Sequence, residues 1–191
     1  MKRYSNLIVL SFLFVMMTGV CKAQQVAVKT NLLYLATATP NLAVEFATGA
    51  KHTLSIGGGW QPWELSDSKK LKHWLVQPEF RYWPCETFNG HFFGIHALGG
   101  QFNAYGIRLP FGIFSSLEDN RYQGWAAGGG LTYGYQWILS RRWNLELSAG
   151  VGYVYIDYKK YKCWQCGRPI EKSHHNYFGP TKVNITLVYS L

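Results

Sequence analysis

Apolar and polar residues alternate with a period of two along most of the chain after residue 24. The odd positions from 143 to 155 hold Trp, Leu, Leu, Ala, Val, Tyr and Tyr, and the even positions from 142 to 152 hold Arg, Asn, Glu, Ser, Gly and Gly. Successive side chains of a strand point to opposite faces, so this segment predicts a strand with one apolar face and one polar or small face. Residues 124–137 and 182–191 follow the same pattern.

Five further strands are predicted upstream of these three, giving about eight in all. Two of the five, at residues 26–35 and 91–103, alternate less cleanly. In the first of these two, Leu33 and Leu35 break the alternation. Pro78 interrupts another, where it removes a ladder hydrogen bond or marks a bulge. The five segments are residues 26–35, 41–46, 53–61, 74–82 and 91–103.

The connections between the predicted strands alternate in length, apart from a short first connection at residues 37–40. Short turns on one side and longer loops on the other are typical of outer-membrane barrels, whose turns are periplasmic and whose loops face outward. The pattern therefore predicts an all-β chain that forms a single up-and-down antiparallel transmembrane β-barrel. Short turns are expected at residues 49–51, 85–90 and 140–141, and long loops at residues 62–73, 104–120 and 159–176.

A membrane barrel turns its apolar face outward, so the polar face is expected to line the interior. An eight-stranded barrel is just wide enough for its own side chains to fill, and buried charges must be paired. Four basic and three acidic residues are expected inside, which favours an ion-pair network over an open pore. They are Lys29, Glu45, Glu79, Arg81, Arg142, Glu146 and Lys182. A soluble periplasmic ligand-binding barrel, which buries its apolar face, is the alternative.

The composition supports the membrane interpretation. The chain is 17% aromatic and 15% charged and contains 20 glycines, a mixture that a barrel with aromatic girdles uses. Aromatic residues near the predicted strand ends are expected at headgroup depth. They are Trp60, Trp125, Trp137, Trp143, Tyr155 and Tyr189.

The first 23 residues have the organisation of a signal peptide. Lys2 and Arg3 precede an apolar run over residues 7–20, and Ala23 ends a small-residue cleavage site. The run is shorter than the roughly 20 residues of a membrane-spanning helix, which argues against a retained anchor. We therefore predict an outer-membrane β-barrel domain at residues 24–191 and a location in the cell outer membrane. Nucleic acid is not expected as a partner, because the basic residues of this +9 chain are scattered.

One loop holds a candidate metal or disulfide site. Cys163 and Cys166 stand three positions apart, and His174 and His175 follow. These four side chains could hold zinc, but adjacent histidines do not easily turn to one ion. In an oxidising compartment a disulfide between Cys163 and Cys166 is the preferred interpretation. No cofactor is expected.

Some outer-membrane barrels modify lipids, which makes a lipid-modifying enzyme a second alternative. Glu171, Ser173, His174 and His175 are close in sequence. Proximity in a loop does not place a base against a nucleophile, so no catalytic residue is assigned and a non-enzymatic role is expected.

Five stretches carry a family resemblance: residues 29–34 (KTNLLY), 40–45 (PNLAVE), 73–83 (HWLVQPEFRYW), 89–92 (NGHF) and 178–182 (FGPTK). They resemble a Bacteroidota domain family of unknown function. The resemblance implies an outer-membrane-type barrel, whose gene often neighbours those of fimbrillin-type surface-fibre proteins. It implies a role in anchoring or assembling surface fibres, with outer-membrane lipid and cell-envelope proteins as partners, and no catalytic residue.

Overall fold

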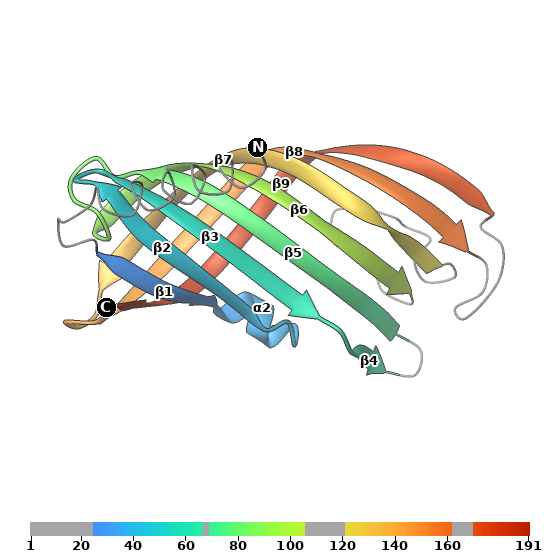
Figure 1. Cartoon of the computed structure of the whole chain (residues 1–191), viewed down its shortest axis with the longest axis horizontal. Helices are drawn as coiled ribbons and strands as arrows, with labels where there is room; N and C mark the ends of the chain where they lie inside the picture. The colour runs from blue at the N-terminus through green and yellow to red at the C-terminus, as the bar shows by residue number, and fades with distance from the viewer. Residues whose placement is uncertain (1–24, 67–68, 106–120, 162–169) are drawn as a thin grey trace, which may run out of the picture.

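The computed structural model of the chain describes residues 25–66, 69–105, 121–161 and 170–191. These residues form one antiparallel β-sheet and one short helix (Figure 1). The elements are β1 (Val26–Asn31), α2 (Leu32–Ala36), β2 (Asn41–Gly49), β3 (His52–Gln61), β4 (Glu64–Ser66), β5 (Lys69–Tyr82), β6 (Gly90–Tyr105), β7 (Arg121–Ile138), β8 (Trp143–Tyr161) and β9 (Glu171–Ser190).

The sheet closes into a barrel. Its nine strands follow the order β3-β2-β1-β9-β8-β7-β6-β5-β4, and β3 also pairs with β5. Because β4 pairs with β5 alone, eight strands remain in the ring. Each ring strand lies beside its neighbours in sequence, and β9 returns to β1. The predicted up-and-down antiparallel barrel of eight strands is therefore confirmed.

The strands are staggered around the barrel. A path from each residue to its register partner on the next strand starts at Ser190 of β9 and returns to β9 at Gly179, eleven positions earlier. One of these eleven positions is the extra residue of a bulge opposite Gly150 and Val151. A stagger of about ten residues over eight strands tilts the strands by about 40° from the barrel axis. The path is Ser190, Ala27, Glu45, Ser55, Glu79, His96, Gly130, Gly152 and Gly179.

The barrel is polar inside and apolar outside. Buried positions include lysine, arginine, glutamate, asparagine, serine and threonine side chains. The outer wall exposes large apolar residues on every long strand, as the alternation predicts for a barrel with a polar interior. Examples are Leu42, Ile56, Trp74, Phe80, Ile95, Leu131, Leu147, Val151, Phe178 and Val183.

An aromatic cluster closes the end of the barrel where β2–β3, β5–β6 and β7–β8 are connected, which we call the turn end. Trp83 and Phe92 are 0% exposed, with ring centroids 4.9 Å apart, and Phe88 packs against Trp83. Phe88 lies in the predicted turn at residues 85–90, and its φ of 64° directs the chain back over the barrel. We call Trp83, Phe88 and Phe92 the aromatic plug.

The first strand is shorter than the sequence predicts. A strand to residue 35 was expected, but β1 ends at Asn31 and α2 follows. The Asn31 side chain accepts a hydrogen bond from the backbone N–H of Leu33 at 3.0 Å and so caps the helix. The capping asparagine and the leucines that break the alternation explain the difference.

The strands also reach further toward the opposite end, which we call the loop end. A loop was expected at residues 159–176, but β8 runs to Tyr161 and β9 begins at Glu171. These residues are polar on both faces, so alternation could not mark them as strand. Pro78 behaves as expected, because the ladder to β6 lacks pairs at residues 77–78 while the ladder to β3 is continuous.

The predicted signal peptide at residues 1–23 and the cysteines Cys163 and Cys166 lie outside the described residues. Within the described part of the chain, no helix is long and apolar enough to cross a membrane.

Candidate functional site

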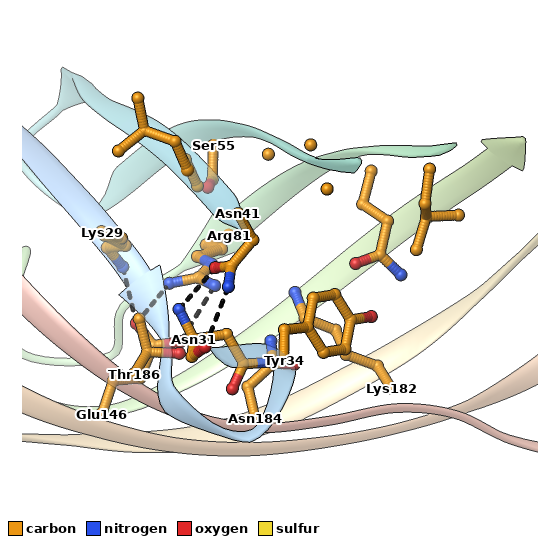
Figure 2. Close-up of a pocket in the computed structure, with 17 residues that line it drawn as sticks. Lys29, Asn31, Tyr34, Asn41, Ser55, Arg81, Glu146, Lys182, Asn184 and Thr186 are labelled. Atoms are coloured by element: carbon orange, nitrogen blue, oxygen red, sulfur yellow. Dashed lines mark hydrogen bonds and ion pairs between the residues drawn. The ribbon is translucent and has the colours of Figure 1, made fainter. Parts of the chain in front are cut away.

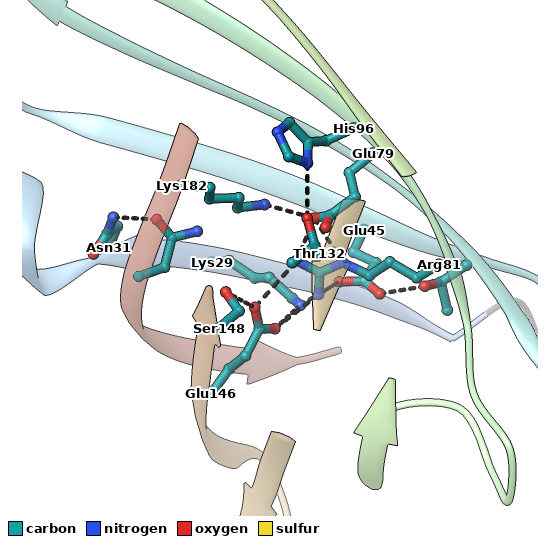
Figure 3. A network of polar contacts seen from close by, with 12 residues as sticks. Lys29, Asn31, Glu45, Glu79, Arg81, His96, Thr132, Glu146, Ser148 and Lys182 are labelled. Carbon is teal, nitrogen blue, oxygen red and sulfur yellow. Dashed lines mark hydrogen bonds and ion pairs between the residues drawn. The ribbon is translucent and has the colours of Figure 1, made fainter. Parts of the chain in front are cut away.

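Six charged side chains meet in the middle of the barrel (Figure 3). Each occupies an inward-facing position of its strand, and each is 7% exposed or less. Closure of the barrel brings residues far apart in sequence into contact across its interior. Lys29 of β1 and Glu146 of β8, 117 positions apart and on strands separated by β9, form an ion pair. We call these six residues the interior charge network: Lys29 of β1, Glu45 of β2, Glu79 and Arg81 of β5, Glu146 of β8, and Lys182 of β9.

Arg81 is the centre of this network. Its guanidinium group donates to Glu79 from Nε at 2.9 Å and from Nη2 at 2.6 Å. It also donates to Glu146 at 2.8 and 3.1 Å and to Glu45 at 3.0 Å. Three carboxylates from three strands are thus held by one planar cation, whose fixed donor geometry suits such bonding.

The two lysines complete the charge balance. Lys29 Nζ pairs with Glu45 and lies 2.6 Å from Glu146 Oε2. Lys182 Nζ lies 2.6 Å from Glu79 Oε2. Three cations therefore face three carboxylates, and the network carries no net charge. Every charge has an opposite partner, as burial at this depth requires.

Neutral polar groups surround the charges. Thr53 donates to Glu45, and Ser148 lies 3.4 Å from Glu146 Oε1. His96 contacts the hydroxyl oxygens of Thr132 at 2.8 Å and Thr181 at 2.9 Å. These contacts fix the imidazole between β7 and β9.

The network is joined to the aromatic plug at the turn end. The Arg81 guanidinium lies 4.3 Å from the centre of the Phe92 ring, and Trp83 Nε1 donates to Thr53 Oγ1 at 3.0 Å. A cation over an aromatic face is attracted by the ring quadrupole. Charge network and plug therefore form one continuous filling of the barrel.

A small cavity lies on the loop side of the network (Figure 2). Its volume is about 60 Å³, enough for a few water molecules. Glycines at positions 57–59 leave this space, and Asn31 Nδ2 donates to Asn184 Oδ1 across it at 2.8 Å. Tyr34 of α2 also lines the cavity, and burial raises the pKa of its phenol, which therefore remains neutral. The cavity is too small for a typical organic ligand.

Arg142 is a correction to the predicted interior set. It precedes the first residue of β8 and is exposed in the β7–β8 turn, where it donates to the Tyr189 hydroxyl at 3.0 Å. Its parity matches that of the inward residues of β8. Because β8 begins at Trp143, Arg142 remains in the turn and its side chain lies outside the barrel interior.

The two histidines of the candidate metal site lie in β9. They are successive strand residues and therefore point to opposite faces of the wall, so they do not converge on one ion. His174 stacks on Tyr155 with ring centroids 5.8 Å apart. Among the residues that the structure describes, no three His, Cys, Asp or Glu side chains are grouped to hold a metal.

Sequence reasoning missed the asparagine pair and the aromatic plug. Asn31 and Asn184 lie on inward positions of strands that meet only when the barrel closes. The plug residues Trp83 and Phe92 are apolar residues directed inward, opposite to the pattern of the wall. Only the position of Phe88 within the predicted turn could have suggested that this end is closed.

Comparison with known proteins gives a family but no activity. A family model described as "Protein of unknown function (DUF3575)" matches residues 8–191. No curated protein matches the chain.

Proposed function

Because the chain belongs to the family of proteins of unknown function DUF3575, whose description assigns no activity, we propose a role from the barrel itself. The protein is an outer-membrane β-barrel without enzymatic activity, and it anchors a partner of the cell envelope at its loop end. A surface-fibre protein is the partner that the family resemblance favours.

The reversed polarity of the barrel carries this proposal. Leu131 and Ile95 are each 64% exposed at the middle of the outer wall, while Glu45 and Arg81 are at most 2% exposed inside. If the barrel were in water, this arrangement would leave a large apolar surface in contact with solvent and would bury charged side chains with no compensating burial of that apolar surface. In a bilayer the same wall contacts lipid, and a closed barrel satisfies its backbone hydrogen bonds between strands.

Aromatic residues mark both ends of the apolar wall. Trp60, Trp74 and Trp125 lie near the loop end, and Trp137 and Trp143 near the turn end. Trp125 and Trp137 are twelve residues apart on β7. At about 3.3 Å per residue and about 40° of tilt, the two indoles are roughly 30 Å apart along the axis. Membrane barrels have an apolar band of similar height, about 25 Å.

The filled interior supports an anchoring role rather than transport. The charge network and the aromatic plug occupy the middle and the turn end, and the cavity near them holds only about 60 Å³. The long strands β7, β8 and β9 extend the wall at the loop end and provide a surface for a partner there.

Fractionation of the native host tests this proposal. The protein is expected in the outer-membrane fraction after density separation, and it should resist extraction by alkaline carbonate. Recovery in the soluble periplasmic fraction would contradict the proposal and favour the soluble ligand-binding alternative.

A further inference from the structure

The turn end of the outer wall carries a level ring of aromatic and imidazole side chains. Register partners on adjacent strands lie about 4.8 Å apart, and the strands tilt by about 40°, so each step along the series β3, β5, β6, β7, β8 and β9 moves about 3 Å toward the loop end. Two residues along one strand span about 5 Å of the barrel axis. Six outward residues, one from each strand of the series, therefore lie within about 3 Å of a common level. We call them the turn-end ring: His52, Tyr82, His91, Trp137, Trp143 and Tyr189.

Contacts between rings keep these side chains on the outer wall. Trp137 and Trp143 are 42% and 45% exposed, and Trp143 meets Tyr189 with ring centroids 4.9 Å apart. His91 Nδ1 lies 2.6 Å from the hydroxyl oxygen of Tyr133, which is 50% exposed. Tryptophan and tyrosine rings favour headgroup depth in a bilayer. The turn-end ring therefore marks the level at which lipid phosphates lie at this end of the barrel.

Cationic side chains outnumber acidic ones beside the turn-end ring. The strand ends and turns there hold Lys51, Arg141 and Arg142, all exposed, and one acidic side chain, that of Glu86. The glutamates of the adjoining strands point into the barrel, where the interior charge network pairs them. The surface at the turn end is therefore positive and attracts anionic molecules. These strand ends and turns are residues 25–27, 48–52, 83–91, 138–143 and 188–191.

Arg142 is the cation with the clearest position. Its Nη1 donates to the Tyr189 hydroxyl at 3.0 Å, which holds the guanidinium group against the outer wall. Trp143, the next residue, contacts the same Tyr189 ring. A guanidinium group presents five N–H donors in a planar fork that matches two phosphate oxygens. Arg142 therefore provides a phosphate-binding group at headgroup depth, with an exposed indole beside it.

The surroundings of Arg142 select a lipid over a soluble anion. On the side toward the loop end, the turn-end ring borders the exposed apolar wall, where Leu147 is 48% and Phe93 is 52% exposed. The molecule that fits has an anionic group next to an apolar body, as a phospholipid has. A phosphatidylcholine headgroup carries its own cation, which offsets the phosphate, so a lipid with net negative charge fits better.

We propose that Arg142, with Trp143 and Tyr189, binds the phosphate group of an anionic phospholipid in the leaflet at the turn end. The proposal rests on the membrane location proposed above and names the class of lipid that the barrel selects. The phosphate oxygens accept hydrogen bonds from the Arg142 guanidinium group, and the acyl chains lie along the apolar wall. Arg141 supplies a second cation beside this phosphate.

Competition between two lipids tests this proposal. The purified protein is equilibrated in detergent micelles with equal amounts of phosphatidylglycerol and phosphatidylcholine that carry the same acyl chains, and mass spectrometry of the intact protein counts the lipids retained. The unaltered protein is expected to retain at least about fivefold more phosphatidylglycerol, because each cation near a lipid surface contributes a preference of that order. Arg142→Gln should lower this ratio at least about threefold.

Lys159→Gln is the matched control, since it also removes one exposed cation. Lys159 lies at the loop end, two residues beyond Asp157, which is the register partner of Trp125. This variant is expected to keep the lipid ratio of the unaltered protein. A gel band whose migration changes on boiling shows beforehand that both variants fold.

Other results would overturn the proposal. Equal retention of the two lipids by the unaltered protein, or an unchanged ratio in Arg142→Gln, would exclude a phosphate site at Arg142. Equal losses in Arg142→Gln and Lys159→Gln would mean that the lipids respond to total charge. Loss of selectivity with inorganic phosphate, but not with chloride at the same ionic strength, would assign Arg142 to a soluble anion. Failure to float with vesicles would instead remove the proposed function, and flotation measures this separately.

Discussion

Arg81 connects three carboxylates that come from different strands. Its bonds to Glu45, Glu79 and Glu146 are all between 2.6 and 3.1 Å, in an interior closed to solvent. Removing one member of a buried ionic network leaves an uncompensated charge, which costs more than the intact network contributes. Substitutions in this network are therefore expected to destabilise the barrel mainly by unbalancing its buried charge, more than by removing single contacts.

Arg81→Met is expected to lower the free energy of unfolding by about 3–5 kcal/mol, because three buried carboxylates would then face two lysines. Arg142→Met, which removes an exposed arginine, should cost less than about 1 kcal/mol. Urea unfolding of the refolded variants in detergent measures both changes. Equal effects of the two substitutions would contradict the assignment of Arg81 to the centre of the network.

Glu79 and Lys182 form a pair whose loss can be compensated. Glu79→Gln alone leaves the network at +1, and Lys182→Met alone leaves it at −1. The double variant restores neutrality, so it should be more stable than the sum of the single effects predicts, by about 1–3 kcal/mol. A double-mutant cycle in urea measures this coupling, and simple additivity would show that the two charges do not interact.

At the scale of elements, glycines allow β7 and β8 to approach closely. Gly130 and Gly152 are register partners. A Cβ atom at Gly130 would lie 2.2 Å from the carbonyl oxygen of Val151 and 2.8 Å from Cα of Gly152. No side chain fits between the strands at this point.

Gly130→Ala is therefore expected to separate the two strands and to lower the yield of folded barrel, with a stability loss of at least about 2 kcal/mol. Gly99→Ala is the control, since a Cβ at Gly99 meets nothing within 4 Å. The fraction of protein in the folded band of an unboiled gel reports both. A folded yield for Gly130→Ala equal to that of Gly99→Ala would contradict this account of the strand contact.

The elements also show what the sequence could predict. Alternation predicted the strands with apolar outer faces and placed six of the seven candidate charges correctly in the interior. It did not predict the outer ends of β8 and β9, because residues that are polar on both faces carry no period. It also missed the three-residue strand β4 and the helix α2, whose apolar run Leu32–Ala36 follows the capping residue Asn31. The contacts within the network follow from barrel closure, which brings Lys29 and Glu146 together across 117 positions.

At the scale of the whole molecule, the interior is filled from the charge network to the aromatic plug. Ions have no continuous water-filled path through such an interior. The purified protein in planar lipid bilayers is expected to produce no steady conductance, with a general porin as the positive control. Stable conductance steps would contradict a closed barrel.

The central claim is that this wall is built to contact lipid. Refolding from urea, by dilution into phospholipid vesicles or into buffer alone, tests it most directly. Only the sample refolded into vesicles is expected to give a gel band whose migration changes on boiling. The protein in that sample is also expected to float with the vesicles in a density gradient. A soluble folded monomer in buffer without lipid would contradict it.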